Sequence, residues 1–285
     1  MISFGFYQVI KERLKSNLDN RMKTRLYKYF PYDDNFKSCL KEGYLWFSKA
    51  ESFNDPFEFK LQVKEALTDE EILEFFKLYK NKSVSPLESI TNDFNKVLFR
   101  YRQDPKTFTD LFLKPFVEHI SRIGVCCFSY TWNNILMWSH YADNHKGVVC
   151  EFDSNMLESS IGRINNEVNA IVIGAVDYSP TFPLINVSSS HTLLSAEVRR
   201  AIFTKSIEWQ YEKEVRILSN QTGRNQINRN SISKIYLGAR FSEKNKTEIL
   251  DLAKQYFPKN QPEIINTIFD DRNYSLKEGL SPVSL

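Results

Sequence analysis

A charged segment in the C-terminal half carries residue types that are suited to chemistry. Residues 209–217 read Trp-Gln-Tyr-Glu-Lys-Glu-Val-Arg-Ile, and neighbouring side chains of a β-strand point to opposite faces. A strand here would place Glu212, Glu214 and Arg216 on one face. They could form cross-strand ion pairs on a solvated sheet face. They could also form an acid pair in a cleft, where the arginine keeps a neighbouring carboxylate ionised.

A second polar segment precedes it. Residues 133–145 are predicted to form a helix that ends before Gly147, and this helix carries His140, Tyr141 and His145. The two histidines are five positions apart, which does not direct both imidazoles at one metal ion as the H-E-x-x-H spacing does. His140 could serve a site, or it could be an ordinary partner of a backbone carbonyl.

The third segment joins a predicted strand over residues 44–48 to the turn at residues 53–58. Trp46 and Ser48 lie in the strand, and Asn54 and Asp55 lie in the turn, between phenylalanines and before a proline. Asn and Asp commonly bond to their own turn backbone, which is one explanation for this pair. The other is that they add polar groups to the same site.

The remaining elements predict an α+β fold with a mixed, largely antiparallel sheet core. Strands are expected at residues 25–30, 125–130, 147–152, 170–178, 212–218, 234–237 and 264–269. Apolar residues at every fourth position from Phe6 to Met22 predict an amphipathic N-terminal helix. Capping signals at Thr68, Ser85 and Asp104 predict three inserted helices. We expect a single domain over residues 1–285, with the helical insertion at about 64–122.

Net charge, sequence motifs and cysteine spacing indicate which kinds of ligand and which compartment to expect. The formal net charge is +3, which gives no support for a nucleic-acid partner. Neither a G-x-G-x-x-G nor a G-x-x-x-x-G-K-[ST] motif occurs, so a nucleotide site would need another construction. The four cysteines form no C-x-x-C pair and are expected to be free thiols in a reducing cytoplasm. No apolar stretch is long enough to span a membrane, so no membrane association is expected.

In order and spacing, these segments resemble the bacterial family catalogued as domain of unknown function 2971. The stretches that carry the resemblance are Leu26-Tyr27-Lys28-Tyr29, Leu45-Trp46-Phe47-Ser48 with Phe53-Asn54-Asp55-Pro56-Phe57, Met137-Trp138-Ser139-His140-Tyr141-Ala142 with His145-Lys146-Gly147, and Trp209-x-Tyr211-Glu212-x-Glu214-x-Arg216. The resemblance implies a fold and no established activity.

A more distant likeness implies chemistry. The opening strand, the helix over residues 35–41 and the late Glu212-x-Glu214-Val215 strand look like the layout of NAD-dependent ADP-ribosyltransferases. By this likeness Glu214 is the essential catalytic glutamate, Glu212 and His140 assist it, and NAD is a co-substrate. The binding residues would be Arg25, Lys28, Trp46, Ser48, Asn54, Asp55, Tyr141, Trp209, Tyr211 and Arg216. Lys28 stands where some of these enzymes carry histidine.

Two other functions fit the same residues. One is a metal-dependent nuclease or phosphohydrolase that uses Asp55, His140, Glu212 and Glu214 as ligands. The other is a non-enzymatic module that senses a ligand or binds a partner, in which the polar segments only hold the fold. Either enzyme requires convergence, so we expect Lys28, Ser48, Asp55, His140 and Glu214 to line one cleft. We also expect replacement of Glu214 by Gln to remove activity while the chain still folds.

Overall fold

The computed structural model describes residues 25–60, 62–63, 67–79, 93–106, 110, 120–161, 163–164, 167–168, 171–185 and 199–282. The amphipathic N-terminal helix and the segment around Ser85 lie outside these ranges. The chain divides into two compact units. The first comprises residues 1–48, 124–176 and 210–285, and the second comprises residues 49–123 and 177–209.

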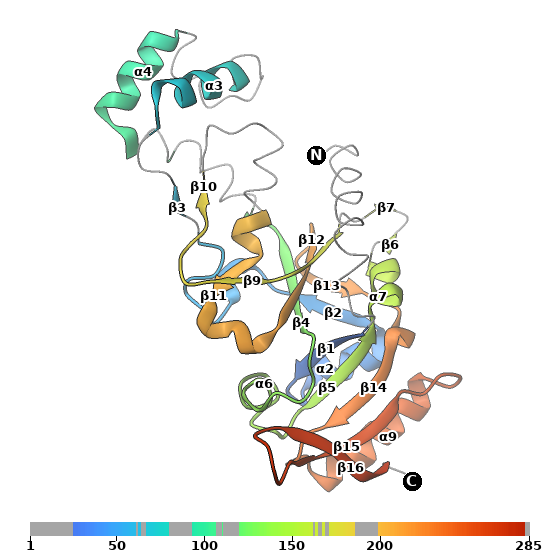
Figure 1. Ribbon diagram of the computed structural model, residues 1–285. Coiled ribbons are helices and arrows are strands. Elements are labelled where there is room, and N and C mark those ends of the chain that lie inside the picture. Colours follow the sequence, from blue (N-terminus) through green and yellow to red (C-terminus); the bar gives the residue numbers. More distant parts are fainter. Residues whose placement is uncertain are drawn as a thin grey trace. The chain divides into compact units, whose positions relative to one another are not determined.

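An eight-stranded sheet forms the first unit (Figure 1). Its strands, in spatial order, are β16 (Leu276–Pro282), β15 (Glu263–Phe269), β14 (Ile232–Leu237), β5 (Val148–Asp153), β1 (Arg25–Phe30), β4 (Gly124–Ser129), β12 (Glu214–Ser219) and β8 (Ile171–Ala175). The β14–β15 pair is parallel and the other neighbours are antiparallel. The predicted α+β class with a mixed, largely antiparallel sheet is therefore confirmed.

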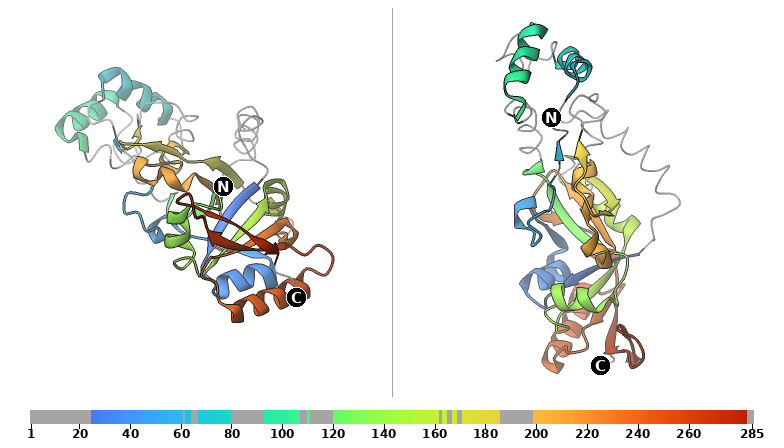
Figure 2. Two further views of the ribbon diagram at one scale, coloured as in Figure 1. Left: turned by 60° about the horizontal axis from the view of Figure 1, so that its bottom comes forward. Right: turned by 60° about the vertical axis from the view of Figure 1, so that its left-hand side comes forward.

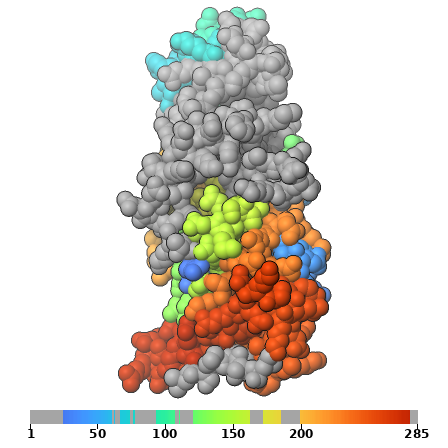
Figure 3. All heavy atoms as spheres, turned by 90° about the vertical axis from the view of Figure 1, so that its right-hand side faces the viewer, coloured from blue at the N-terminus to red at the C-terminus, as the bar shows by residue number. Residues whose placement is uncertain are grey.

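The main apolar core lies against one face of this sheet. The alternate residues Leu26 and Phe30 of β1 contribute to it, together with α2 (Asp34–Glu42) and α9 (Glu243–Tyr256). The two helices lie side by side, as the left view of Figure 2 shows. Segments from the C-terminal third, drawn in red and orange, form much of the surface in Figure 3.

The helix over residues 35–41 was correctly predicted because both of its ends carry signals. Asp33 accepts a hydrogen bond from the backbone N–H of Phe36 at 3.0 Å, which caps the start of α2. Gly43 ends the helix with φ +70°, a left-handed conformation in which glycine has no Cβ penalty.

A second apolar cluster lies on the opposite face, where α6 (Ile135–Tyr141) packs on Tyr29, Val149 and Tyr236. The prediction that this helix reaches His145 was wrong. It ends at Tyr141, and Asp143, Asn144 and His145 have φ values of 44°, 51° and 70°. A right-handed helix cannot continue through three successive left-handed residues.

The strand predicted to begin at Glu212 also begins later. Residues 207–212 form the 3₁₀ helix η2 (Ile207–Glu212), and β12 starts at Glu214. Between them Lys213 has φ +46°, which interrupts extended backbone. Glu212 is therefore not part of the strand face that carries Glu214 and Arg216.

The second unit contains α3 (Asp69–Tyr79) and α4 (Phe94–Gln103), whose apolar residues pack together around Ile72 and Val97. The predicted capping box is present, because the Thr68 N–H donates to Glu71 Oε2 at 2.8 Å and the Glu71 N–H to Thr68 Oγ1 at 3.3 Å. Short parallel pairs join β3 (Gln62–Val63) to β10 (Leu184–Ile185) and β9 (Asp177–Ser179) to β11 (Thr204–Ser206). Beyond residue 106, only residue 110 and the residues from 120 onward in the predicted third helix lie within the described ranges.

The further elements of the first unit are short. They are β2 (Tyr44–Phe47) paired with β13 (Gly223–Gln226), β6 (Arg163–Ile164) paired with β7 (Glu167–Val168), the helix α7 (Ser154–Ile161), and the 3₁₀ turn η3 (Arg229–Ser231). The second unit has the 3₁₀ turn η1 (Ala50–Ser52). Across the described part of the chain, no helix has both the length and the apolar character needed to cross a membrane.

Candidate functional site

Two of the predicted site residues, Tyr141 and Glu212, are joined by a hydrogen bond. The Tyr141 hydroxyl, at the end of α6, donates to Glu212 Oε1 at 2.6 Å. Glu212 is buried, whereas Tyr141 is partly exposed. This distance is at the short end of the range for O–H···O hydrogen bonds. The contact joins segments 71 positions apart.

The backbone around Glu212 is fixed by side chains from two other elements. The Ser129 hydroxyl at the end of β4 donates to the Glu212 carbonyl at 2.6 Å. Asn134 Nδ2 donates to the Tyr211 carbonyl at 3.1 Å, while Asn134 Oδ1 caps the first turn of α6. One asparagine thus holds α6 and η2 together, so the Tyr141 hydroxyl and the Glu212 carboxylate have a defined geometry.

Aromatic rings cluster at Tyr141, whose hydroxyl donates to this carboxylate. The exposed His140 ring is 6.1 Å from the Tyr141 ring and 6.4 Å from the partly exposed Tyr211 ring, measured between centroids. The face of an aromatic ring is electronegative and attracts cations. Rings beside a carboxylate therefore favour a planar or positively charged ligand group.

Glu214 and Arg216 form a separate, fully buried pair. Arg216 Nε donates to Glu214 Oε1 at 2.8 Å and Arg216 Nη2 to Glu214 Oε2 at 3.1 Å. Their side chains are 4% and 0% exposed, respectively. This contact is an ion pair within β12 and is buried, so it differs both from the solvated cross-strand pairs and from the acid pair in a cleft that the sequence left open. The negative charge of Glu214, after burial, raises the pKa of the neighbouring Cys127 thiol.

A row of side chains on the α6 face connects Glu214 with a second buried carboxylate. Direct pairing in the sheet aligns Lys234, Glu151, Tyr27, Ser129 and Glu214 across five adjacent strands. Paired residues of neighbouring strands project to the same face. The polar row therefore runs across the middle of the sheet.

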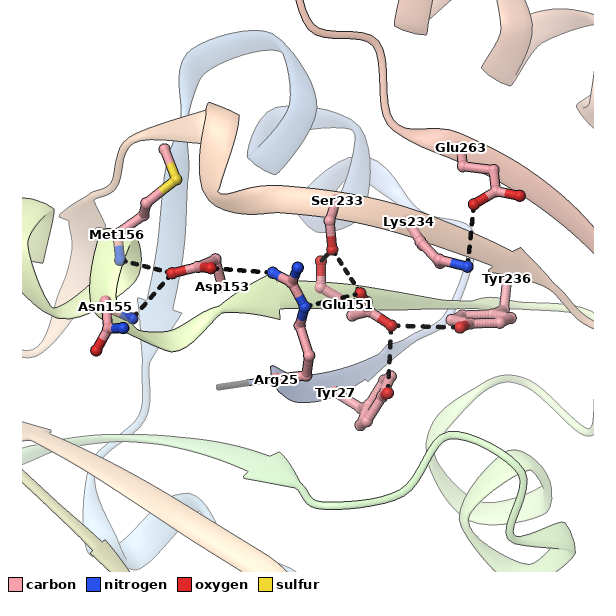
Figure 4. Close-up of polar contacts among 10 residues, drawn as sticks. All are labelled: Arg25, Tyr27, Glu151, Asp153, Asn155, Met156, Ser233, Lys234, Tyr236 and Glu263. Atoms are coloured by element: carbon pink, nitrogen blue, oxygen red, sulfur yellow. Dashed lines mark hydrogen bonds and ion pairs between the residues drawn. The ribbon is translucent and has the colours of Figure 1, made fainter. Parts of the chain in front are cut away.

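Glu151 is the centre of the cluster in Figure 4. Its carboxylate accepts hydrogen bonds from the hydroxyls of Tyr27 at 3.2 Å, Tyr236 at 3.3 Å and Ser233 at 2.7 Å. Burial, and then the charge of Glu151, raises the pKa of Tyr27 to about 12 and raises that of Tyr236 further. Both hydroxyls therefore keep their protons and act as donors at neutral pH.

Sequence reasoning missed Glu151 and its tyrosine partners. The available signal was a glutamate inside the apolar run Val148-Val149-Cys150-Glu151-Phe152, because a charge in a buried strand needs partners. Arg25, which was predicted, belongs to this cluster. Its Nε lies 3.4 Å from Glu151 Oε1, and its Nη1 donates to Asp153 Oδ2 at 3.0 Å.

Three predicted residues of the first unit lie away from Glu212. Lys28 projects to the opposite face, where its Nζ donates to the Cys127 carbonyl at 3.0 Å and lies about 5.5 Å from the Phe128 ring. Ser48 bridges to Val125, at the far end of β4 from Ser129. Trp46, 52% exposed, pairs with Arg224 on β13. Their predicted binding roles receive no support from this geometry.

The other predicted residues belong to the second unit. Asp55 is buried, and its Oδ1 accepts a hydrogen bond from the backbone N–H of Phe57 at 2.8 Å, so it stabilises its own turn. The neighbouring Asn54 is exposed. Trp209 lies under the Lys205 ammonium at 4.8 Å, and Lys205 forms a buried ion pair with Glu58 at 3.2 Å.

The described residues contain no group of three or more His, Cys, Asp or Glu side chains arranged to hold a metal ion. Within the first unit, the His140 ring lies beside the rings of Tyr141 and Tyr211, and the Glu214 carboxylate accepts a hydrogen bond from Arg216. The ligand set of the metal-dependent alternative is thus not assembled in this part of the structure.

His145 is held between rings on the α6 side. Its imidazole stacks on Trp138 with 6.4 Å between centroids and contacts the Phe269 ring at 5.2 Å, while its Nε2 lies 3.1 Å from Ser139 Oγ. Its buried Nδ1 has no hydrogen-bond partner among the described residues. Burial, and then the positive Arg240, lowers its pKa below the ordinary value.

The environment of His145 predicts that the free energy of unfolding depends on pH. Because the folded pKa of His145 is lowered, the unfolded chain binds the proton first as the pH falls below about 6.5. The free energy of unfolding should therefore decrease on acidification through that window. Urea titrations of the wild type and of His145→Gln between pH about 7.5 and 5 would measure it. An equally steep decrease in the variant would exclude His145 as its source.

Comparison with models of known protein families gives a match to this chain. The model of the family described as "Protein of unknown function (DUF2971)" matches residues 137–217. The match contains residues 137–141 of α6, the Tyr141–Glu212 contact and the Glu214–Arg216 pair, and it confirms the resemblance to this family. Nothing among the curated proteins or the solved structures matches the chain.

Proposed function

We propose that this protein, a match to the DUF2971 model over residues 137–217, is an ADP-ribosyltransferase-like enzyme that takes NAD as co-substrate at the Tyr141–Glu212 site. The observation that carries the proposal is the 2.6 Å contact between the Tyr141 hydroxyl and the Glu212 carboxylate beside the rings of His140 and Tyr211. A carboxylate with partly exposed aromatic neighbours suits the cationic nicotinamide ring.

NAD supplies a glycosidic bond whose cleavage develops positive charge on the ribose. A fixed carboxylate stabilises such charge because it needs no reorganisation when the charge appears. Glu212 is fixed in this way by Tyr141 on its side chain and by Ser129 on its carbonyl. The Glu214–Arg216 pair anchors the start of β12 behind it. This assigns the catalytic carboxylate to Glu212 and a supporting role to Glu214.

Other features agree with this proposal. Arg25, on the sheet face that α6 covers, is 44% exposed and could bind the phosphates of a nucleotide. All four cysteines are free, which fits the reducing cytoplasm where we place the protein. The ADP-ribosyl group would pass to an acceptor macromolecule, with release of nicotinamide.

Binding and turnover of NAD test the proposal together. We expect NAD at about 1 mM to raise the midpoint of thermal unfolding, as any ligand of the folded state does. We also expect purified protein to release nicotinamide, with or without a metal chelator. Binding without turnover would favour the non-enzymatic module. Turnover of phosphodiesters that the chelator abolishes would favour the metal-dependent hydrolase, and no binding would reject NAD as the ligand.

A further inference from the structure

Arg25 has an arrangement that leaves one side of its guanidinium unused. An arginine side chain has five N–H donors in a fixed plane. The Nε group faces Glu151 at 3.4 Å and Nη1 donates to Asp153 at 3.0 Å. Its other N–H groups have no acceptor among the residues that the structure covers, and the side chain is 44% exposed. Figure 4 shows the guanidinium between the two carboxylates.

The Glu151 carboxylate is held in place by several hydrogen-bond donors besides Arg25. Its side chain is 7% exposed, and three hydroxyl donors from three different residues fix both carboxylate oxygens. The Tyr236 ring is itself held by the Trp132 ring, stacked at 4.4 Å with an interplanar angle of 8°. Asp153 is fixed too, because its Oδ1 caps α7 through the N–H groups of Asn155 and Met156.

We infer that Glu151, together with Asp153, is a positioning residue that orients Arg25 to bind the diphosphate group of a ligand on this sheet face. Bidentate recognition of phosphate requires the guanidinium plane to be set before the ligand arrives. A pre-oriented arginine loses less side-chain entropy on binding than a free one. For NAD this inference rests on the proposed function, whereas for inorganic pyrophosphate it does not.

The direction in which Glu151→Gln changes the affinity for pyrophosphate distinguishes a positioning role from a purely electrostatic one. Glu151→Gln removes a negative charge near the anion, so Coulomb's law alone predicts tighter binding of pyrophosphate. Loss of orientation predicts weaker binding, by roughly three- to tenfold, which is the cost of immobilising one flexible side chain. Arg25→Met should weaken binding by at least about tenfold, because it removes the charged donor itself.

The experiment is calorimetric titration of the full chain with pyrophosphate and with ADP-ribose. Glu158→Gln on α7 is the matched control, because this exposed residue makes the same charge change away from the cluster. Asp153→Asn is the second test variant, since asparagine preserves the helix cap and loses the charge. Thermal unfolding of each variant establishes that it is folded.

Weaker binding by Glu151→Gln and Asp153→Asn, with an unchanged control, supports the inference. Unchanged or tighter binding by both variants overturns it, as does wild-type protein that binds neither anion. Anion binding that depends on Arg25 in a protein that does not turn over NAD would reject the proposed function and leave this inference standing. If NAD is turned over, Glu151→Gln should raise its KM at constant kcat.

Discussion

Replacement of Glu214 by Gln is expected to lower the free energy of unfolding by about 3–5 kcal/mol, the range observed when one partner of a buried ion pair is removed. Arg216 is fully buried and uses two nitrogen atoms on Glu214. The variant would leave its charge without the bidentate carboxylate. Chemical denaturation monitored by circular dichroism measures the effect directly.

Glu263→Gln is the matched control for this experiment. Glu263 pairs with Lys234 at 3.0 Å, but its side chain is 55% exposed, so the expected change is at most about 1 kcal/mol. If Glu214→Gln proves no more destabilising than this exposed variant, the buried pair does not stabilise the fold as described. From the sequence alone we expected this substitution to leave folding intact, and the bidentate contact reverses that expectation.

Glu212→Gln should have the opposite profile, with a large loss of activity and a small loss of stability. The amide oxygen of Gln can still accept the hydrogen bond from Tyr141, so the local structure should be preserved. The charge that would stabilise the developing cation is lost, which should reduce kcat for NAD cleavage by about a hundredfold or more. Nicotinamide release and the thermal midpoint should be measured on the same sample.

Two further variants sharpen this test. Glu208→Gln changes an exposed glutamate of η2 and should retain full activity. Tyr141→Phe removes the hydroxyl donor and should lower activity less than Glu212→Gln, because the carboxylate remains. A folded Glu212→Gln protein with wild-type turnover would remove Glu212 from the mechanism.

The sequence predicted the elements of the first unit well where local signals mark their ends. Asp33 and Gly43 bound α2, whose limits were predicted to within one residue at each end. Local rules failed at residues 143–145 and at Lys213, because non-glycine residues adopt left-handed conformations there. Such conformations are held by tertiary contacts, such as the bond from the Arg240 N–H to the His145 carbonyl at 3.0 Å.

For the candidate site, the sequence identified Tyr141 and Glu212 as components but not their contact. It also treated Glu212 and Glu214 as equivalent members of one strand face. Their different environments follow from the turn at Lys213 and from strand pairing between distant segments, which residue types and spacing do not encode. Glu151 was not predicted as a site residue because its partners lie on β1 and β14, far from it in sequence.

The central place of β1 in the sheet has a consequence for synthesis on the ribosome. β1 is the first described strand to be made, yet both of its edges pair with strands that end at Ser129 and Asp153. At typical translation rates the nascent strand would wait on the order of 5 to 20 s for these neighbours. During that interval its unpaired edges and the apolar side chains of Leu26 and Phe30 would be open to wrong partners. Productive folding of this chain should therefore depend on the speed of elongation and on chaperones that cover β1.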